Sequence, residues 1–143
     1  MTVKAMLAAK GGEVVTIEPN THVLAASKLL AERRIGALVV TGADRRVVGI
    51  VSERDIVQRL AVQGASALDL PLNEVMTRKV MTCNPADTIS SVMERMTEGK
   101  FRHLPVVDQG RLIGIVSIGD VVKHRLEEME REQSALRDYI QTA

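Results

Sequence analysis

The sequence predicts an α/β protein of the α+β kind, in which two β-α-β-β-α repeats pack face to face about a pseudo-two-fold axis. The first reason is a motif that occurs twice: Gly-Ile-Val-Ser-Glu-Arg-Asp at 49–55 returns at 114–120 as Gly-Ile-Val-Ser-Ile-Gly-Asp. The second reason is the match around it, because Thr16 and Thr82 occupy corresponding places before the two motifs. Only two copies are present, so the chain is a duplicated half-domain and not a solenoid.

The first repeat is expected to hold three strands and two helices. Short apolar runs bounded by Pro, Gly and Asp predict the strands, and a helix is expected to begin after a cap at Asn20 or Thr21. In chain order we expect a strand at 14–17, a helix that follows the cap at 20 or 21 and ends near 33–34, strands at 37–41 and 46–51 joined by a hairpin turn, and a helix from 52 to 63.

The second repeat is expected to follow the same order. Its elements are a strand at 80–83, a helix at 87–98, strands at 103–107 and 111–116, and a helix that starts at 117. Helical lead-in segments at 3–9 and 72–77 precede the two repeats. The expected domains are a first repeat with its lead-in helix over 1–64, a linker and second repeat over 65–123, and a C-terminal helix extension over 124–143.

Each repeat alone would have a three-stranded sheet with helices on one face only. The other face would expose apolar side chains to water, which a stable domain avoids by adding a second layer. Two repeats pressed together supply that layer to each other. We therefore expect the two sheets to face one another and the helices to lie outside.

The helix that begins at Ser117 is expected to run on to about Gln141. Its apolar positions form a heptad-like stripe with one polar member, at Val122, Leu126, Met129, Gln133, Leu136 and Ile140. Two interpretations stay open at this point: the stripe packs on the helix's own domain, or it pairs with a second copy of the chain. Two or three heptads are marginal alone, so in the second case the helix assists a homodimer interface.

Composition argues against several classes of function. The formal net charge is +1 and the aromatic residues are Phe101 and Tyr139, so neither a basic surface nor a stacking platform for nucleic acid is expected. No apolar run reaches the roughly 18–20 residues of a membrane span, and we expect no secretory signal at the start. The single Cys83 cannot form an internal disulfide, which predicts a cytoplasmic location.

The two Ser-x-x-Asp corners admit a structural and a functional interpretation. A helix N-terminus leaves backbone N–H groups unpaired, so Ser52 with Asp55, and Ser117 with Asp120, can form reciprocal capping boxes. Both pairs also stand at the same strand-to-helix corner, directly after Gly-Ile-Val. A carboxylate at such a corner can accept hydrogen bonds from the vicinal hydroxyls of a ribose where the corner faces a cleft.

A second candidate feature is the basic pair Arg102-His103, which enters an apolar strand. Arg suits phosphate through its planar fork of donors, although an ordinary solvated loop would carry such charges too. The first repeat has Gly36-Ala37 at the corresponding place. We therefore expect two unequal clefts, and we expect the cleft of Asp120, in the same repeat as Arg102, to be the better ligand site.

These features resemble those of CBS domains, named after cystathionine β-synthase, in their usual tandem pair. The resemblance rests on Thr16, on Pro19 and on the 49–55 motif with their counterparts, and it covers roughly 3–123. The stretch Phe-Arg-His-Leu-Pro-Val-Val at 101–107 is similar to the family's aromatic-Arg-His-Leu-Pro-Val pattern. The resemblance implies two clefts between the repeats that take AMP, ADP, ATP, NAD or S-adenosylmethionine, with AMP expected first.

The resemblance also implies a role for each site residue. The Asp of each motif would hold the ribose hydroxyls with the Ser beside it, and the Thr of each first strand would supply a polar contact. Arg102, His103 and Arg54 would contact phosphate, while the backbone around Ala37 and Leu104 would contact the adenine edge. The expected nucleotide-binding residues are Thr16, Ala37, Ser52, Arg54, Asp55, Thr82, Arg102, His103, Leu104, Pro105, Ser117 and Asp120.

No catalytic or metal-binding group is expected from the sequence. The three histidines, His22, His103 and His124, lack metal-ligand spacing with Cys83 or with paired carboxylates, and Lys10-Gly11-Gly12 is interpreted as a helix stop. The expected function is a regulatory, non-enzymatic sensor of adenine nucleotides that acts on an unknown effector protein. The alternative is a ligand-independent interaction module with vestigial clefts, and an enzyme is a more distant third interpretation.

Overall fold

The computed structural model describes residues 1–142. The helices and strands, in chain order, are α1 (Val3–Lys10), β1 (Thr16–Ile17), α2 (Val23–Arg33), β2 (Ala37–Thr41), β3 (Val47–Ser52), α3 (Glu53–Gln63), α4 (Ile89–Gly99), β4 (His103–Asp108), β5 (Arg111–Ser117) and α5 (Ile118–Thr142). Three short 3₁₀ turns connect them: η1 (Ala43–Arg45), η2 (Gly64–Asp69) and η3 (Leu72–Glu74). Among the described residues, no helix combines the length and the hydropathy that a bilayer crossing requires.

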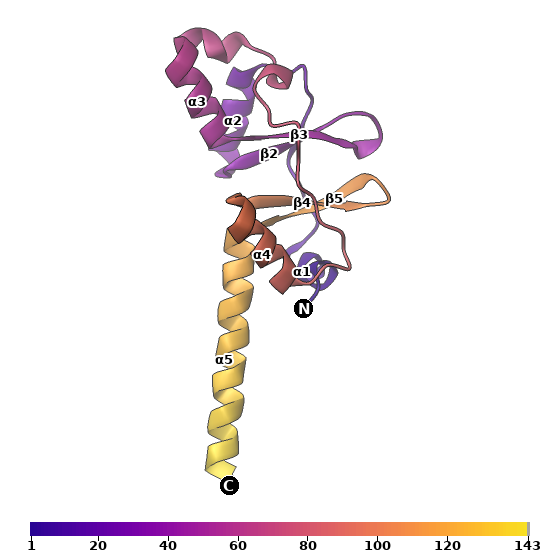
Figure 1. Ribbon diagram of the computed structural model, residues 1–143, viewed down its shortest axis with the longest axis vertical. Helices are drawn as coiled ribbons and strands as arrows, with labels where there is room; N and C mark the ends of the chain where they lie inside the picture. Colours follow the sequence, from indigo (N-terminus) through magenta and orange to yellow (C-terminus); the bar gives the residue numbers. More distant parts are fainter. Residues whose placement is uncertain (143) are drawn as a thin grey trace.

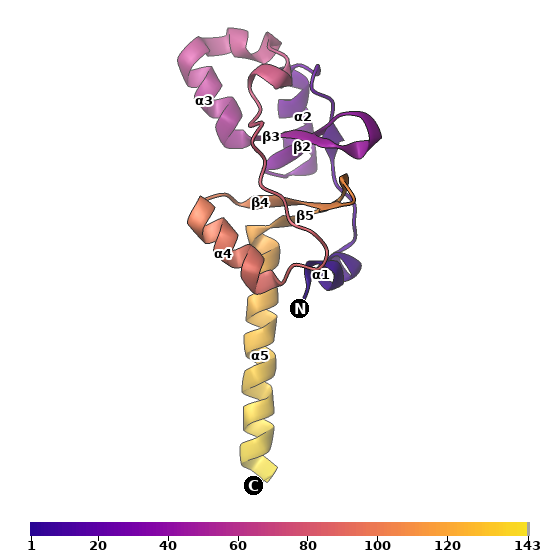
Figure 2. The same ribbon diagram turned by 45° about the vertical axis from the view of Figure 1, so that its right-hand side comes forward.

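Two small sheets form the centre of the molecule. In the first sheet β1 pairs with β2 in parallel and β2 pairs with β3 antiparallel, and in the second sheet β4 pairs with β5 antiparallel. The sheets lie one above the other, and helices α2, α3 and α4 lie on their outer sides (Figures 1 and 2). This arrangement confirms the predicted α+β fold with the two repeats face to face.

A reciprocal pair of hydrogen bonds joins the two hairpins. Arg45 Nε donates to the carbonyl oxygen of Leu112 at 3.1 Å, and Arg111 Nε donates to the carbonyl oxygen of Asp44 at 3.3 Å. Each guanidinium thus reaches the backbone of the other repeat. The exchange is what an approximate two-fold axis between the repeats requires.

The strand predicted at 80–83 is wrong in extent. Only Cys83 makes a bridge there, in parallel with Val106. The carbonyl oxygen of Thr82 instead accepts a hydrogen bond from Arg95 Nη1 at 2.8 Å. The second sheet therefore has two named strands and one bridged residue.

The predicted helix starts also needed correction. Helix α2 begins at Val23 behind His22, which makes no side-chain cap bond, so neither Asn20 nor Thr21 is the cap. Thr88 caps α4 by accepting a hydrogen bond from the Ser91 N–H at 3.1 Å. These starts lie one or two residues after the predicted ones, because propensity patterns do not locate helix ends closely.

The lead-in segments are exchanged between the repeats. Helix α1 precedes the first repeat in the chain, yet its Val3, Met6 and Leu7 lie in the apolar core of the second repeat, together with Cys83 and its neighbours. Leu72 and Met76, which precede the second repeat, lie in the core of the first. Figure 2 shows α1 beside the second sheet. The two cores are therefore built from segments that cross between them.

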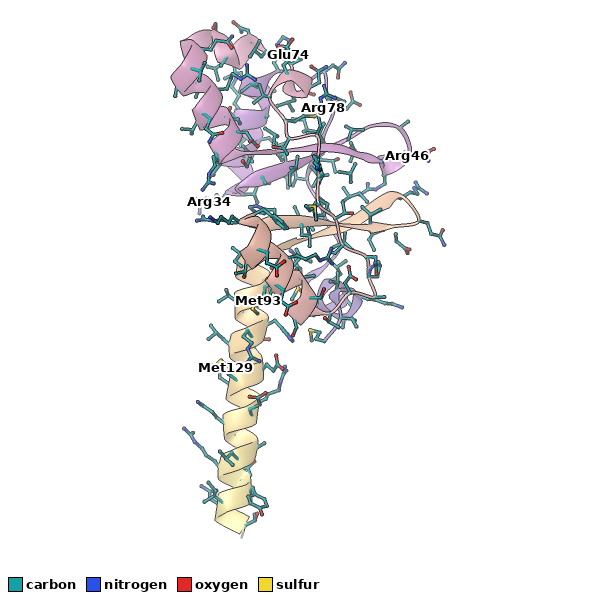
Figure 3. The ribbon with its side chains drawn as sticks, in the orientation of Figure 1. Arg34, Arg46, Glu74, Arg78, Met93 and Met129 are labelled. Atoms are coloured by element: carbon teal, nitrogen blue, oxygen red, sulfur yellow. The ribbon has the colours of Figure 1, made fainter. Side chains whose placement is uncertain are left out.

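Helix α5 leaves the body of the molecule. Its first turns pack inward through Val121 and His124, both buried, whereas residues 131–142 are all exposed. Figure 1 shows the helix continuing well past the other elements, and Figure 3 shows Met129 projecting from it with no other element alongside. The interpretation that the apolar stripe packs on its own domain is therefore wrong, and the predicted helix length is confirmed.

Candidate functional site

A cavity of about 760 Å³ lies between the two repeats. Its walls come from the β3–α3 corner of the first repeat, from the linker ahead of Thr82, and from the segment between α4 and β4. Six of the residues predicted for a ligand site line it: Ala37, Ser52, Arg54, Asp55, Arg102 and His103. The cavity therefore joins the carboxylate corner of one repeat to the basic pair of the other.

The Asp55 corner is a capping box, as its structural interpretation predicts. Asp55 Oδ2 accepts hydrogen bonds from the backbone N–H of Ser52 at 2.8 Å and from the Ser52 hydroxyl at 3.0 Å, while Ser52 Oγ accepts from the Asp55 N–H at 3.3 Å. None of these three hydrogen bonds uses Oδ1 of Asp55, which has no hydrogen-bond donor within residues 1–142. A corner that closes its own helix thus still offers one acceptor oxygen.

Cations outnumber carboxylates on the cavity wall. Arg54, Arg102 and three further basic residues line it, against the acidic side chains of Glu53, Asp55 and Glu98. The three further basic residues are Lys79, Arg95 and Lys100. Arg95 donates hydrogen bonds to the Thr82 carbonyl oxygen and to Asp87. Lys79 and Lys100 are therefore the two basic residues that add to Arg54 and Arg102 on the wall. Sequence reasoning missed both lysines because they belong to no motif.

His103 stands where the two repeats meet. A Cβ atom placed on Gly36 would lie 3.4 Å from His103 Cε1, so the start of the first sheet and the imidazole are in van der Waals reach across the interface. Burial is the main cause that lowers the pKa of His103, and Lys10 and Arg102 lower it further while Asp120 and Glu53 oppose them. These effects together favour the neutral imidazole.

The cavity also has an apolar side. Ala37 is buried at the start of β2, and Ile50, Val80, Met81 and Phe101 line the same wall. Such a wall suits a flat ring better than a charged group. The cavity thus combines an acceptor, several cations and an apolar surface.

Four predicted residues lie outside this cavity. Leu104 and Pro105 are buried within β4, and Thr16 is half-buried in β1, where it pairs with Val39. Thr82 is half-buried and its carbonyl oxygen holds Arg95. The structure therefore brings none of the four to the Asp55 corner.

Asp120 and Ser117 also lie outside the cavity, in an environment of their own. Asp120 Oδ2 accepts from the Ser117 N–H at 2.9 Å and forms an ion pair with Lys10 Nζ, which also donates to the Ile115 carbonyl oxygen at 2.8 Å. Burial opposes ionisation, but the Lys10 and Ser117 hydrogen bonds together hold the pKa of Asp120 below its ordinary range. Lys10, interpreted from sequence as part of a helix stop, reaches the corner from the end of α1.

The sequence grouped Arg102 and His103 with Asp120 because all three belong to the second repeat. The structure places both basic residues on the wall of the cavity that Asp55 lines, while His103 also pairs with Ser117, beside Asp120, in the second sheet. The physical reason is the face-to-face packing, which sets the start of β4 against the corner of the opposite repeat. Residues of different repeats, such as Arg102 and Asp55, can therefore share a cavity although they are far apart in the chain.

A second cavity, of about 750 Å³, lies between α1 and the outer end of the second repeat. None of the residues predicted for the ligand site lines it. No group of three or more His, Cys, Asp or Glu side chains suited to a metal ion occurs in residues 1–142. Burial raises the pKa of Cys83 to about 11, which makes its thiol a poor nucleophile at neutral pH.

The fold and the cavity define a tandem-repeat module with a polar cleft between its halves. Within that class the family is shown directly, because the CBS domain model matches residues 10–62 and again residues 72–127. The chain belongs to the CBS domain family, as a tandem pair. The matches indicate no enzymatic family. The domain bounds predicted at 64 and 123 stay a prediction.

Similar proteins agree with this assignment. The mitochondrial CBS domain-containing protein CBSX3 of Arabidopsis thaliana is 37% identical over 120 residues, which are 81% of this chain and 58% of that protein. The chain thus spans little more than half the length of that relative. The crystal structure of the CBS-domain containing protein ATU1752 from Agrobacterium tumefaciens is 47% identical, with a TM-score of 0.84 over 87% of this chain and 99% of that one.

Two similar structures contain ligands. The CBS domain pair of protein MJ0100, in complex with 5′-methylthioadenosine and S-adenosyl-L-methionine, is 26% identical with a TM-score of 0.80, over 90% of this chain and 98% of that one. The CBS domain protein PAE2072 from Pyrobaculum aerophilum, complexed with AMP, is 28% identical with a TM-score of 0.75, over 84% of this chain and 89% of that one. Both ligand sets contain adenosine.

Proposed function

We propose that this chain is a regulatory module that binds an adenosine-containing ligand in the Asp55 cavity, with AMP as the first candidate. The observation that carries the proposal is the presence of Asp55, Arg102 and an apolar wall in one cavity of suitable size. ADP, ATP, NAD and S-adenosylmethionine share the adenosine part and are the other candidates. The ligand-bearing relatives support the class of ligand.

Each part of AMP has a matching part of the cavity. The ribose hydroxyls donate to Oδ1 of Asp55, beside Ser52, while the adenine ring packs on the apolar wall formed by Ile50, Val80 and Phe101. The phosphate lies toward Arg102, where an Arg guanidinium can bind it with two parallel hydrogen bonds. Its charge also favours protonation of His103, which burial disfavours.

The proposed stoichiometry is one ligand per chain. The carboxylate of Asp120 already holds Lys10, and a ribose at that corner would have to displace the ion pair. The Asp55 carboxylate holds only partners from its own capping box. This reverses the expectation that the Asp120 cleft is the better site.

Binding is proposed to act by population shift. A ligand held by both repeats stabilises the arrangement in which Asp55 and Arg102 face the same space, so it biases the shapes of the module toward that arrangement. A cytoplasmic homodimer that reports this bias to an effector protein is the proposed working unit.

The test is calorimetric titration of the chain with AMP, ADP, ATP, NAD and S-adenosylmethionine. Asp55→Ala is expected to weaken binding at least about tenfold, because it removes the ribose acceptor. Asp120→Ala is the matched control, since it removes the same kind of capping box from a corner that does not line the cavity. Affinity lost equally in both variants would contradict the choice of cleft. No binding of any of the five at millimolar concentration would leave the ligand-independent interaction module as the better explanation.

A further inference from the structure

The exposed stripe of α5 has the pattern of a two-stranded coiled coil. Its apolar members are 45% to 65% exposed: Val122, Leu126, Met129, Leu136 and Ile140. The opposite side of the helix carries Val121 and His124, which are buried against the body. The stripe therefore points away from the chain's own core, and a partner is needed to cover it.

The spacing of the stripe fixes the heptad positions. Val122, Met129 and Leu136 take the d positions, and Leu126, Gln133 and Ile140 take the a positions. The flanking e positions are then Lys123, Glu130 and Arg137, and the flanking g positions are Arg125, Glu132 and Tyr139. These flanking residues decide which way a partner helix can run.

In a parallel, in-register pair each g residue faces the e residue five positions later on the other helix. Arg125 then faces Glu130 of the second copy, and Glu132 faces Arg137 of the second copy. Both contacts join opposite charges, and the two-fold axis makes each of them twice. The parallel arrangement is electrostatically complementary.

In an antiparallel pair with full overlap of the stripe, e faces e and g faces g. Glu130 then faces Glu130, Glu132 faces Glu132, and Lys123 faces Arg137. Every charged contact joins like charges. The same sequence thus favours one orientation and disfavours the other.

We propose that α5 pairs with α5 of a second copy of this chain as a parallel, in-register coiled coil. Gln133 meets its own counterpart at the single polar a position, which is a feature that specifies register. The two bodies then stand at the same end of the assembly. Because the stripe spans fewer than three heptads, contacts between the bodies add to it, and Val57 of α3, the counterpart of Val122, is 62% exposed for such a contact. This proposal rests on the homodimer and not on nucleotide binding.

Orientation is tested by disulfide trapping in the full chain. Ile140→Cys places a thiol at an a position next to its counterpart in the parallel pair, where a disulfide can close. In the antiparallel pair Ile140 faces Val122, so the two thiols are roughly 27 Å apart along the helices. Under mild oxidation the parallel pair gives a covalent dimer for most of the protein. Asp138→Cys, at the outward f position, and the parent chain with its buried Cys83 are the controls and are expected to give none.

Charge reversal tests the e–g contacts by a second measurement, sedimentation equilibrium. Glu130→Arg is expected to weaken dimerisation by roughly tenfold, because it sets two arginines against each other in both symmetric contacts. Adding Arg125→Glu to the same chain restores opposite charges and is expected to restore the dimer. In the antiparallel pair Glu130 faces itself, so its reversal would change nothing.

The outcomes separate the two proposals. A chain that is monomeric at all concentrations contradicts both the homodimer and the coiled coil. A dimer that forms no disulfide through Ile140→Cys, or that is indifferent to Glu130→Arg, contradicts the parallel coiled coil alone.

Discussion

Asp55 and Asp120 occupy the same corner of their repeats and close the same kind of capping box, yet their carboxylates meet different neighbours. Asp55 faces the cavity, whereas Asp120 holds Lys10 from 110 residues away in the chain. The motif decides the local geometry of each corner. What the carboxylate can bind is decided by the side chain that another element brings to it.

His103 supplies a prediction about pH. Burial, as the main cause, lowers its pKa below the ordinary 6.5, so the unfolded chain binds this proton more readily than the folded chain does. The free energy of unfolding is therefore expected to decrease as the pH falls through 6.5 toward the lower folded-state pKa, and to be unaffected by this group at higher pH. Denaturant unfolding between about pH 5 and 8 measures it.

Two variants attribute that pH dependence to one side chain. His103→Gln is expected to flatten the decrease, because it removes the group that the unfolded chain protonates first. His22→Gln removes an exposed histidine and is expected to leave the slope as it is in the parent chain. Equal slopes in the parent and in His103→Gln would contradict the assignment.

At the scale of residues, six of the twelve residues predicted for a ligand site line the cavity. Ser52, Asp55, Arg102 and His103 could be singled out because their residue types and positions carry a chemical meaning in the chain itself. Lys79 and Lys100 could not, because a lysine in a loop has the same pattern whether it faces a cavity or the solvent. Only the packing of one repeat on the other distinguishes the two cases.

At the scale of elements, a side chain from a lead-in segment packs directly on the glycine that begins each motif. A Cβ atom on Gly49 would lie 2.5 Å from Met76 Sδ, and a Cβ atom on Gly114 would lie 2.7 Å from Leu7 Cδ2. Both distances are shorter than atoms can approach without a shift. The strands β3 and β5 thus need glycine there because segments from outside the repeat pack directly on their backbone.

Gly49→Ala is expected to reduce the free energy of unfolding by about 1–3 kcal/mol, since Met76 and the nearby Thr77 carbonyl must move to admit a methyl group. Gly119→Ala is the control, because its nearest neighbour, Ser117 Oγ, would lie 3.6 Å from the new Cβ. In the first turn of α5 that change is expected to be neutral or to stabilise by up to about 1 kcal/mol. Urea unfolding of both variants checks the pair, and a neutral Gly49→Ala would refute the packing argument.

Element prediction succeeded where a signal was long and failed where it was short. Helix α5 was predicted nearly to its last residue, because its heptad pattern extends over six positions. The strand at 80–83 was overestimated, because only Cys83 pairs with β4. A run of four residues is too short for its periodicity to show how many of them pair with a neighbouring strand.

At the scale of the whole molecule, the exchange of lead-in segments makes the two repeats depend on each other. Leu72, fully buried in the first core, comes from the stretch ahead of the second repeat, and Val3, fully buried in the second core, comes from the start of the chain. Each such side chain contributes roughly 1.5–3 kcal/mol by its burial. A cut between the repeats removes these contributions from both.

Fragments 1–64 and 65–143 are therefore each expected to lack a cooperative thermal transition, although together they contain every residue of the duplicated fold. Fragment 11–80 keeps Leu72 and Met76 with the first core, and it is expected to show the cooperative transition that fragment 1–64 lacks. Circular dichroism at increasing temperature measures all three beside the full chain. A cooperative transition in fragment 65–143 would show that α1 is dispensable to the second core.

Periodicity in the sequence could not predict this exchange. Periodicity located the lead-in helix at 3–9, and we assigned this helix to the first repeat because it comes next to that repeat in the chain. Nothing in the spacing of Val3, Met6 and Leu7 says which of two similar cores they enter. The layer argument did predict the face-to-face packing, because that step depends only on covering an apolar sheet face.

Because α5 is one unbroken helix, a small tilt at its start becomes a larger displacement at its end. The helix starts at the corner where Asp120 and Ser117 close its first turn, and it runs without a break for 25 residues, about 38 Å at 1.5 Å per residue. A tilt of roughly 5° at that corner displaces the far end by about 3 Å, which is enough to separate or realign a pair of side chains. Rotation of one repeat against the other would thus change the distances between charged side chains at the far end of α5, although that end does not contact the cleft.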